Sequence, residues 1–195
     1  MAKHIKRIKE NVTATEYKKL MNFVRGSESM RENTKLNLLR AFTLLFYTGM
    51  RVNETQSLKI AHIKELIKEG TVKVEIDKTL AERKLYLSND FKKDLLKVFD
   101  LSEDDENRVI SKGANKNRKS GITNVTFIAQ INKVMKEVLG NGYTSHSFRQ
   151  GLITEMAQRS INTKVISQFI GHKDIKTTLG YVTPSENDIK NALVR

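Results

Sequence analysis

The fold is decided by one stretch of the chain, residues 146–181, which reads HSFRQGLITEMAQRSINTKVISQFIGHKDIKTTLGY. His146 and Arg149 are three positions apart in it, so on a helix both side chains fall on one face. His172 follows a glycine, and Tyr181 comes nine residues after His172. Guanidinium groups bind phosphate and imidazole moves protons near neutral pH. These residues in this order therefore suit an enzyme that holds a phosphodiester and attacks it through a phenol.

A second arginine stands far upstream, in the sequence Thr48-Gly49-Met50-Arg51. The strongly apolar segment before it predicts a buried helix that ends at Gly49, because glycine is favoured just past helix C-termini. Another helix is expected directly after Arg51. The guanidinium group of Arg51 is thus expected at the mouth of a helix, and only the protein's tertiary fold could bring it to Arg149.

Taken together, these segments resemble the catalytic domain of the tyrosine recombinases (the phage integrase family), and the resemblance covers nearly the whole chain. It implies that Arg51 and Arg149 hold the scissile phosphate and that Tyr181 is the nucleophile. A phenol has a pKa near 10, so it needs neighbouring cations and a proton acceptor to attack at neutral pH. The resemblance also implies that His146 moves that proton or holds a phosphate oxygen. It further implies that His172 donates to a phosphate oxygen.

Two supporting residues follow from the same resemblance. Glu54 lies where the family pattern Thr-Gly-x-Arg-x-x-Glu has its glutamate, so it is expected to brace a neighbouring cation; a solvated helix glutamate is the alternative. The family carries its general acid, a lysine, in a sheet hairpin, and Lys78 matches best by position. Lys73 and Lys84 are rivals, although strand alternation turns both away from the apolar face. The family's turn is usually glycine-rich, whereas residues 77–81 contain no glycine.

The charge of the chain favours a polyanionic partner. Its 35 Lys and Arg against 22 Asp and Glu give a net charge of +13, and each phosphate neutralised by such groups releases counterions. Basic residues concentrate at 3–9 and 112–119. A lysine-rich surface that only maintains solubility is the alternative. We expect double-stranded DNA as the partner, and the residues expected to contact it from the second cluster are Lys112, Lys116, Arg118 and Lys119.

Other functional classes are disfavoured by what the sequence lacks. It has no cysteine, which excludes disulfides and thiolate metal sites. We find no glycine-rich nucleotide loop and no histidine–carboxylate spacing typical of metal sites, so no cofactor and no metal are expected. There is no apolar run long enough for a membrane span and no apolar core after the basic N-terminus. We therefore expect a cytoplasmic, nucleoid-associated protein without a membrane partner.

The spacing of apolar residues predicts a mainly α fold with a small antiparallel three-stranded sheet (α+β). Period-2 alternation at 71–76 and 82–87 predicts a hairpin, and a brief strand at 108–110 is expected as its third member. Helices are expected at about 13–24, 31–48, 52–58, 89–99, 124–139, 147–159, 163–170, 174–181 and from 183 onward. We expect residues 1–12 to be a basic arm or linker and residues 13–195 to form one catalytic domain.

The leading hypothesis is a site-specific recombinase or integrase that cuts and rejoins DNA through a 3′-phosphotyrosyl intermediate. A type IB topoisomerase-like enzyme and a catalytically idle DNA-binding module of the same fold are the alternatives; turnover on a nicked substrate separates the last from the others. Recombination implies a homo-tetramer on two DNA sites, weakly associated without DNA. Family members usually carry a helical DNA-clamping domain upstream, so this chain is expected to bind DNA weakly. Residues 183–193 resemble a terminal helix that docks on a neighbouring subunit, with packing on its own domain as the alternative.

Overall fold

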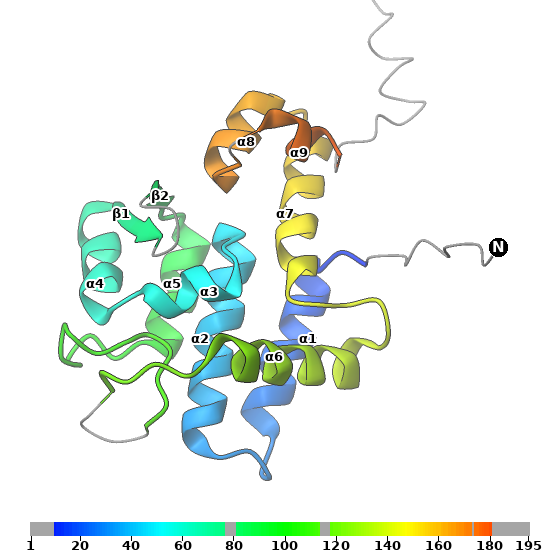
Figure 1. The fold of residues 1–195 in the computed structure, drawn as a ribbon. Helices are drawn as coiled ribbons and strands as arrows, with labels where there is room; N and C mark the ends of the chain where they lie inside the picture. Colours follow the sequence, from blue (N-terminus) through cyan, green and yellow to red (C-terminus); the bar gives the residue numbers. More distant parts are fainter. Residues whose placement is uncertain (1–9, 77–80, 114–117, 173, 181–195) are drawn as a thin grey trace, which may run out of the picture.

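The protein folds around one central helix, α2 (Figure 1). A computed structural model describes residues 10–76, 81–113, 118–172 and 174–180. The elements in these ranges are α1 (Ala14–Gly26), α2 (Glu32–Thr48), α3 (Val52–Ser57), α4 (Ile60–Glu69), β1 (Thr71–Ile76), β2 (Ala81–Tyr86), α5 (Asn89–Val98), α6 (Asn124–Leu139), α7 (His146–Gln158), α8 (Thr163–Ile170) and α9 (Ile175–Leu179). Helices α1, α3, α5 and α7 all contact α2. None of the helices in the described ranges is long and apolar enough to cross a membrane.

The first two helices begin and end where their sequences indicate. At the start of α1, the Thr13 hydroxyl accepts from the Thr15 amide at 3.2 Å and the Glu16 carboxylate accepts from the Thr13 amide at 3.1 Å. These two contacts form a capping box. Helix α2 ends at Gly49, which has a φ of +59° and donates its amide to the Leu45 carbonyl at 3.0 Å. Few residues other than glycine adopt this left-handed conformation, so Gly49 turns the chain directly toward Arg51.

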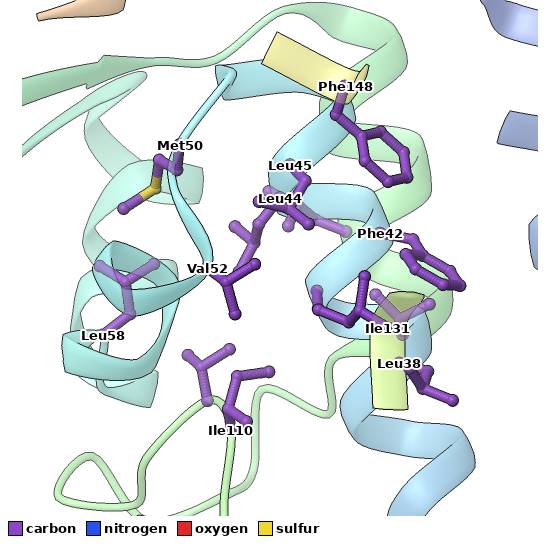
Figure 2. Packing of buried hydrophobic residues seen from close by; sticks show 14 of the residues in the cluster. Leu38, Phe42, Leu44, Leu45, Met50, Val52, Leu58, Ile110, Ile131 and Phe148 are labelled. Atoms are coloured by element: carbon purple, nitrogen blue, oxygen red, sulfur yellow. The ribbon is translucent and has the colours of Figure 1, made fainter. Parts of the chain in front are cut away.

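The hydrophobic core joins α2 to the segments that carry the candidate site (Figure 2). Phe42 of α2 stacks on Phe148 of α7 with ring centroids 5.6 Å apart, and both side chains are fully buried. Ile131 of α6 is fully buried in the same cluster (Figure 2). Burying one such side chain stabilises the fold by about 1.5–3 kcal/mol. Because Phe148 is the neighbour of Arg149, this packing fixes the first turn of α7 and with it the position of Arg149.

The sheet has two strands in the described ranges, not three. Strands β1 and β2 pair in an antiparallel hairpin, as expected, with Val74 opposite Arg83. The expected third strand at 108–110 is wrong. Arg108 forms only an isolated bridge with Lys59, and the Val109 amide donates to the Leu58 carbonyl at 2.9 Å. The reason is that the connection between α3 and α4 supplies backbone hydrogen-bond partners for residues 108–109. The segment therefore pairs with that connection and not with the hairpin.

The start of the described chain is attached to α7. The Val12 amide donates to the Ser147 carbonyl at 3.1 Å, and the Val12 side chain is buried. Gly151 of α7 faces the same backbone, and a Cβ atom at this position would overlap the Val12 carbonyl group. Residues 10–12, which we expected in the basic arm, therefore lie along α7; residues 1–9 fall outside the described ranges.

Candidate active site

Arg149 binds the ends of two helices. Its side chain, on α7, is 3% exposed; Nη1 donates to the Gly49 carbonyl at 2.7 Å and Nη2 to the Ile170 carbonyl at 2.9 Å. Gly49 follows the last residue of α2, and Ile170 is the last residue of α8. Carbonyls at a helix C-terminus lack partners within the helix and carry the negative end of its dipole, so a guanidinium group is stabilised there. Arg149 thus connects two segments more than 100 residues apart.

Arg83 also donates to carbonyls at the C-terminal ends of α2 and α8, in each case one residue before the carbonyl that Arg149 contacts. It lies on the inward face of β2, and its Nη2 donates to the Thr48 carbonyl and, at 3.5 Å, to the Phe169 carbonyl. The guanidinium groups of Arg83 and Arg149 therefore bind carbonyls of adjacent residues at both helix ends. Since adjacent Cα atoms are only about 3.8 Å apart, the two positive groups are neighbours. Two buried arginines from different elements form the floor of the candidate site.

Glu54 lies between Arg83 and Arg51. Its carboxylate is 2% exposed, with Oε2 at 2.7 Å from Arg83 Nη1 and Oε1 at 2.8 Å from Arg51 Nη1. It also accepts from the Arg51 backbone amide at 3.1 Å, which caps α3. Burial by itself raises the pKa of Glu54, but the charges of Arg83 and Arg149 and the hydrogen bonds from Arg51 outweigh it, and the pKa is lowered. Glu54 is therefore ionised at neutral pH and joins the buried floor to Arg51, whose side chain is 44% exposed.

His172 lies next to Arg149, directly after the C-terminal cap of α8. Its Nε2 is 3.2 Å from Arg149 Nε, and its Nδ1 is 2.7 Å from the hydroxyl of Thr178 on α9. Burial, together with the charges of Arg149, Arg51 and Arg83, lowers the pKa of His172 to about 4. The ring is therefore neutral at pH 7, with one N–H group and one lone pair in the ring plane.

The other expected catalytic residues lie around this floor or outside the described ranges. His146 is the first residue of α7, one turn before Arg149, and its side chain is exposed where a bound ligand can reach it. Lys78 and Tyr181 lie outside the described residues. Helix α9 ends at Leu179, and Gly180 is the last described residue before Tyr181.

The expected DNA-contacting residues divide into two groups. Lys112 and Lys119 are exposed, and Lys116 lies outside the described residues. Arg118 points inward instead: it is 7% exposed, its Nε donates to Ser111 Oγ at 3.0 Å, and its Nη1 is 3.6 Å from a Glu103 oxygen. The Arg118 side chain thus anchors its loop to the domain, leaving the two exposed lysines on the surface.

The comparison with known protein families identifies the chain. A model described as the phage integrase family matches residues 10–188. The chain belongs to this family. It is 25% identical over 191 residues to tyrosine recombinase XerA of Pyrococcus furiosus, covering 97% of this chain and 63% of that protein. It is also 25% identical over 170 residues to the TnP I resolvase of Bacillus thuringiensis, covering 84% and 55%.

Solved structures of family members share the fold. The crystal structure of XerA recombinase superposes with a TM-score of 0.67 at 20% identity, covering 93% of this chain and 63% of that chain. The Tn1549 transposon integrase, in complex with a circular intermediate DNA, gives a TM-score of 0.74 at 16% identity, covering 98% and 67%. The chain spans about three fifths of the length of the XerA protein that it matches. The chain is therefore mainly helical with a small antiparallel sheet, and the solved structures share this fold.

Two residues of the site were not anticipated from the sequence. Arg83 carried a signal, because strand alternation places it on the same face as Leu85, where a charged side chain must find a buried partner. Thr178 carried none beyond its position three residues before Tyr181. Within the described ranges, no three histidine or carboxylate side chains are grouped to hold a metal ion. The site that is described offers guanidinium and imidazole groups, which are suited to an oxyanion.

Proposed function

We propose that this chain is the catalytic domain of a site-specific DNA recombinase or integrase. One observation carries the proposal: α2–α3, β2, α7 and the α8–α9 connection bring Arg51, Arg83, Arg149 and His172 to one place. In the sequence, Tyr181 follows His172 by nine residues and comes two residues after Leu179, the last residue of α9. A positively charged floor beside the segment that leads to a phenol is what a phosphotyrosyl-forming enzyme requires.

The proposed reaction needs no metal and no ATP. Arg51 and Arg149 hold the non-bridging oxygens of the scissile phosphate, and Tyr181 attacks the phosphorus atom with His146 accepting the phenol proton. A 3′-phosphotyrosyl bond forms, the bond from phosphorus to the 5′ oxygen breaks, and Lys78 protonates that leaving oxygen. A 5′ hydroxyl of another strand then attacks the intermediate and releases Tyr181. Catalysis rests on positioning and charge stabilisation, because the covalent intermediate conserves the energy of the phosphodiester bond.

Double-stranded DNA is the partner that the charge and the relatives support. The net charge is +13, and solved relatives include a lambda integrase(75–356) dimer bound to a COC′ core site. XerH recombinase has been solved in a post-cleavage complex with its palindromic difH substrate. We infer that the present chain binds duplex DNA and works as a tetramer on two sites. Lys112 and Lys119, which are exposed, are proposed to contact the phosphate backbone of the DNA.

The test is covalent adduct formation with a pool of nicked duplexes whose central region is randomised. A nick lets the short cleaved strand diffuse away, so the phosphotyrosyl adduct accumulates and is detected on a denaturing gel. We expect an adduct with the unmodified protein, in the presence of a chelator, and none with Tyr181→Phe. Tyr143→Phe is the matched control, because Tyr143 packs against the hydrophobic core. Absence of any adduct across the pool, or an adduct that survives in Tyr181→Phe, would refute the proposed function.

A further inference from the structure

A long part of the sequence carries positive charge and no negative charge. No Asp or Glu occurs between Asn107 and Lys136, a stretch that contains several lysines and arginines. The structure describes its first part as residues 108–113 and 118–122, which we call the basic segment. Lys112 and Lys119 of this segment are exposed. A surface of this composition suits a polyanion such as the DNA backbone.

The basic segment is attached to the last turn of α3. Arg108 Nη1 donates to the Gln56 carbonyl at 3.0 Å, and Arg108 Nε donates to the Lys119 carbonyl at 3.1 Å. One guanidinium group therefore joins α3 to the backbone of Lys119. The Gln56 side chain, which is 6% exposed, makes a second connection by donating to the Ile122 carbonyl at 2.9 Å.

The two described branches of the basic segment are also joined to each other. The Arg108 amide donates to the Arg118 carbonyl at 3.0 Å, and the Lys112 amide donates to the Ser120 carbonyl at 2.9 Å. Lys112 and Lys119 therefore stand on one hydrogen-bonded support, and that support ends on α3.

Helix α3 relates this support to the candidate site. Arg51 immediately precedes the first residue of α3, and Gln56 lies in its last turn. The rise from Arg51 to Gln56 is about 7.5 Å at 1.5 Å per residue. With one guanidinium group and its two hydrogen bonds added, the Cα atoms of Arg51 and Lys119 lie within about 20 Å of each other. Since successive nucleotides of one strand are about 3.4 Å apart along the duplex axis, this distance corresponds to about six nucleotides.

We propose that Arg108 is a positioning residue that holds the basic segment at a fixed distance from Arg51. Lys119 then binds a backbone phosphate within about six nucleotides of the scissile phosphate, at a position set by the length of α3. The proposal rests on the proposed function, in which Arg51 holds the scissile phosphate, and adds a second phosphate contact in fixed register with it. Arg108 acts through two backbone carbonyls, so its role requires the planar fork of a guanidinium group and not only a positive charge.

The test measures the coupling between one lysine and one phosphate. Nicked duplexes carry a single neutral methylphosphonate at successive positions on either side of the scissile phosphate, which the adduct experiment locates. Binding is measured in the Tyr181→Phe background, so that no covalent adduct accumulates. At a position within about six nucleotides, we expect the neutral group to weaken binding about three- to fivefold, the effect of one exposed charge pair. In Lys119→Ala the same neutral group should have no further effect.

Two variants remove the connections and leave Lys119 in place. Arg108→Lys keeps the positive charge but cannot bind both carbonyls, and Gln56→Met removes the second connection without changing the charge. In each variant we expect the position-specific effect to fall below about twofold, because the lysine is no longer held opposite one phosphate. The salt dependence of binding should stay that of the unmodified protein. Lys93→Ala is the matched control and should retain the position-specific effect, since Lys93 is an exposed lysine on α5 that pairs with Asp90.

The outcomes keep the two proposals apart. Urea denaturation first establishes that each variant is folded under the binding conditions. If the unmodified protein forms the adduct but no phosphate within this range couples to Lys119, the fixed register is wrong while the proposed function stands. A position-specific effect of full size in Arg108→Lys would overturn the role of Arg108. If the unmodified protein forms no adduct, the proposed function fails, and the positioning role fails with it.

Discussion

Replacing Glu54 by glutamine tests whether the buried charges of the site stabilise each other. Glutamine has the shape of glutamate but no charge, so the substitution leaves Arg83, which is 4% exposed, without its anionic partner. The substitution also removes the ion pair between Glu54 and Arg51. Because Glu54 and Arg83 are buried together, the effect should be that of an uncompensated charge and not that of a surface ion pair.

The expected cost is about 3–5 kcal/mol of unfolding free energy, which is typical of breaking a buried pair by removing one partner. An ion pair on the surface contributes only about 0–1 kcal/mol. The loss of unfolding free energy expected for a buried pair is therefore several times larger than the loss expected for an exposed pair. The double variant Glu54→Gln, Arg83→Met removes both charges and retains much of the volume. We expect it to recover more than half of the loss, because no uncompensated charge remains in the interior.

Urea denaturation at several pH values is the assay. Since the folded-state pKa of Glu54 is lowered from its ordinary value of 4.5, its contribution is complete above that pH and is lost as the pH falls through the folded pKa. The difference in unfolding free energy between the unmodified protein and Glu54→Gln should therefore be largest near pH 7. It should shrink as the pH falls below 4.5. A loss under about 1 kcal/mol at pH 7, or a gap that does not narrow in acid, would refute the reasoning.

Two further predictions concern the surface loop and the start of the chain. Lys112→Ala and Lys119→Ala should each reduce the salt dependence of DNA binding by about 0.9 in log–log slope if each lysine contacts one phosphate; an unchanged slope in fluorescence titrations would remove that lysine from the interface. Gly151→Ala should lower the unfolding free energy by about 1–3 kcal/mol, because the added methyl group overlaps the Val12 backbone and this outweighs the helix propensity gained. Thermal unfolding measures it, and a stabilised variant would show that residues 10–12 do not pack on α7.

Local signals predicted the elements well where the sequence contained its own stop and start residues. The Thr13 capping box, the Gly49 stop and the alternation at 71–76 each specify backbone geometry from neighbouring residues alone. Helix α4 was not predicted, although Ile60, Ile63 and Leu66 lie on its buried face at helical spacing. The surrounding lysines and glutamates obscured that short apolar pattern. In the fold this helix packs against β1, and such tertiary packing, more than propensity, stabilises a short helix.

The strand expected at 108–110 failed for a different reason. Whether a short apolar segment pairs with a sheet depends on which backbone groups remain unpaired beside it, and that is a property of the tertiary fold. Buried Arg40 of α2 donates to the Val98 and Val109 carbonyls and forms an ion pair with Glu103. Residues 108–110 are therefore held against α2 and the α3–α4 connection. A buried arginine with three distant partners could not be inferred from local sequence.

The candidate site shows the same division between local and tertiary information. The family resemblance implied that Arg149 and His172 act on one phosphate. Their partners in the fold are backbone carbonyls at the ends of α2 and α8 and a hydroxyl group on α9. These carbonyls would otherwise lack partners, because helix C-termini always leave some unsatisfied. The buried arginines Arg83 and Arg149 therefore build the floor and stabilise the fold as well as offering positive charge. The side chains of Arg51 and His146 are more exposed than those of Arg83 and Arg149. The site therefore combines buried arginines, whose positions depend on the tertiary fold, with exposed side chains at helix starts, which local sequence indicated.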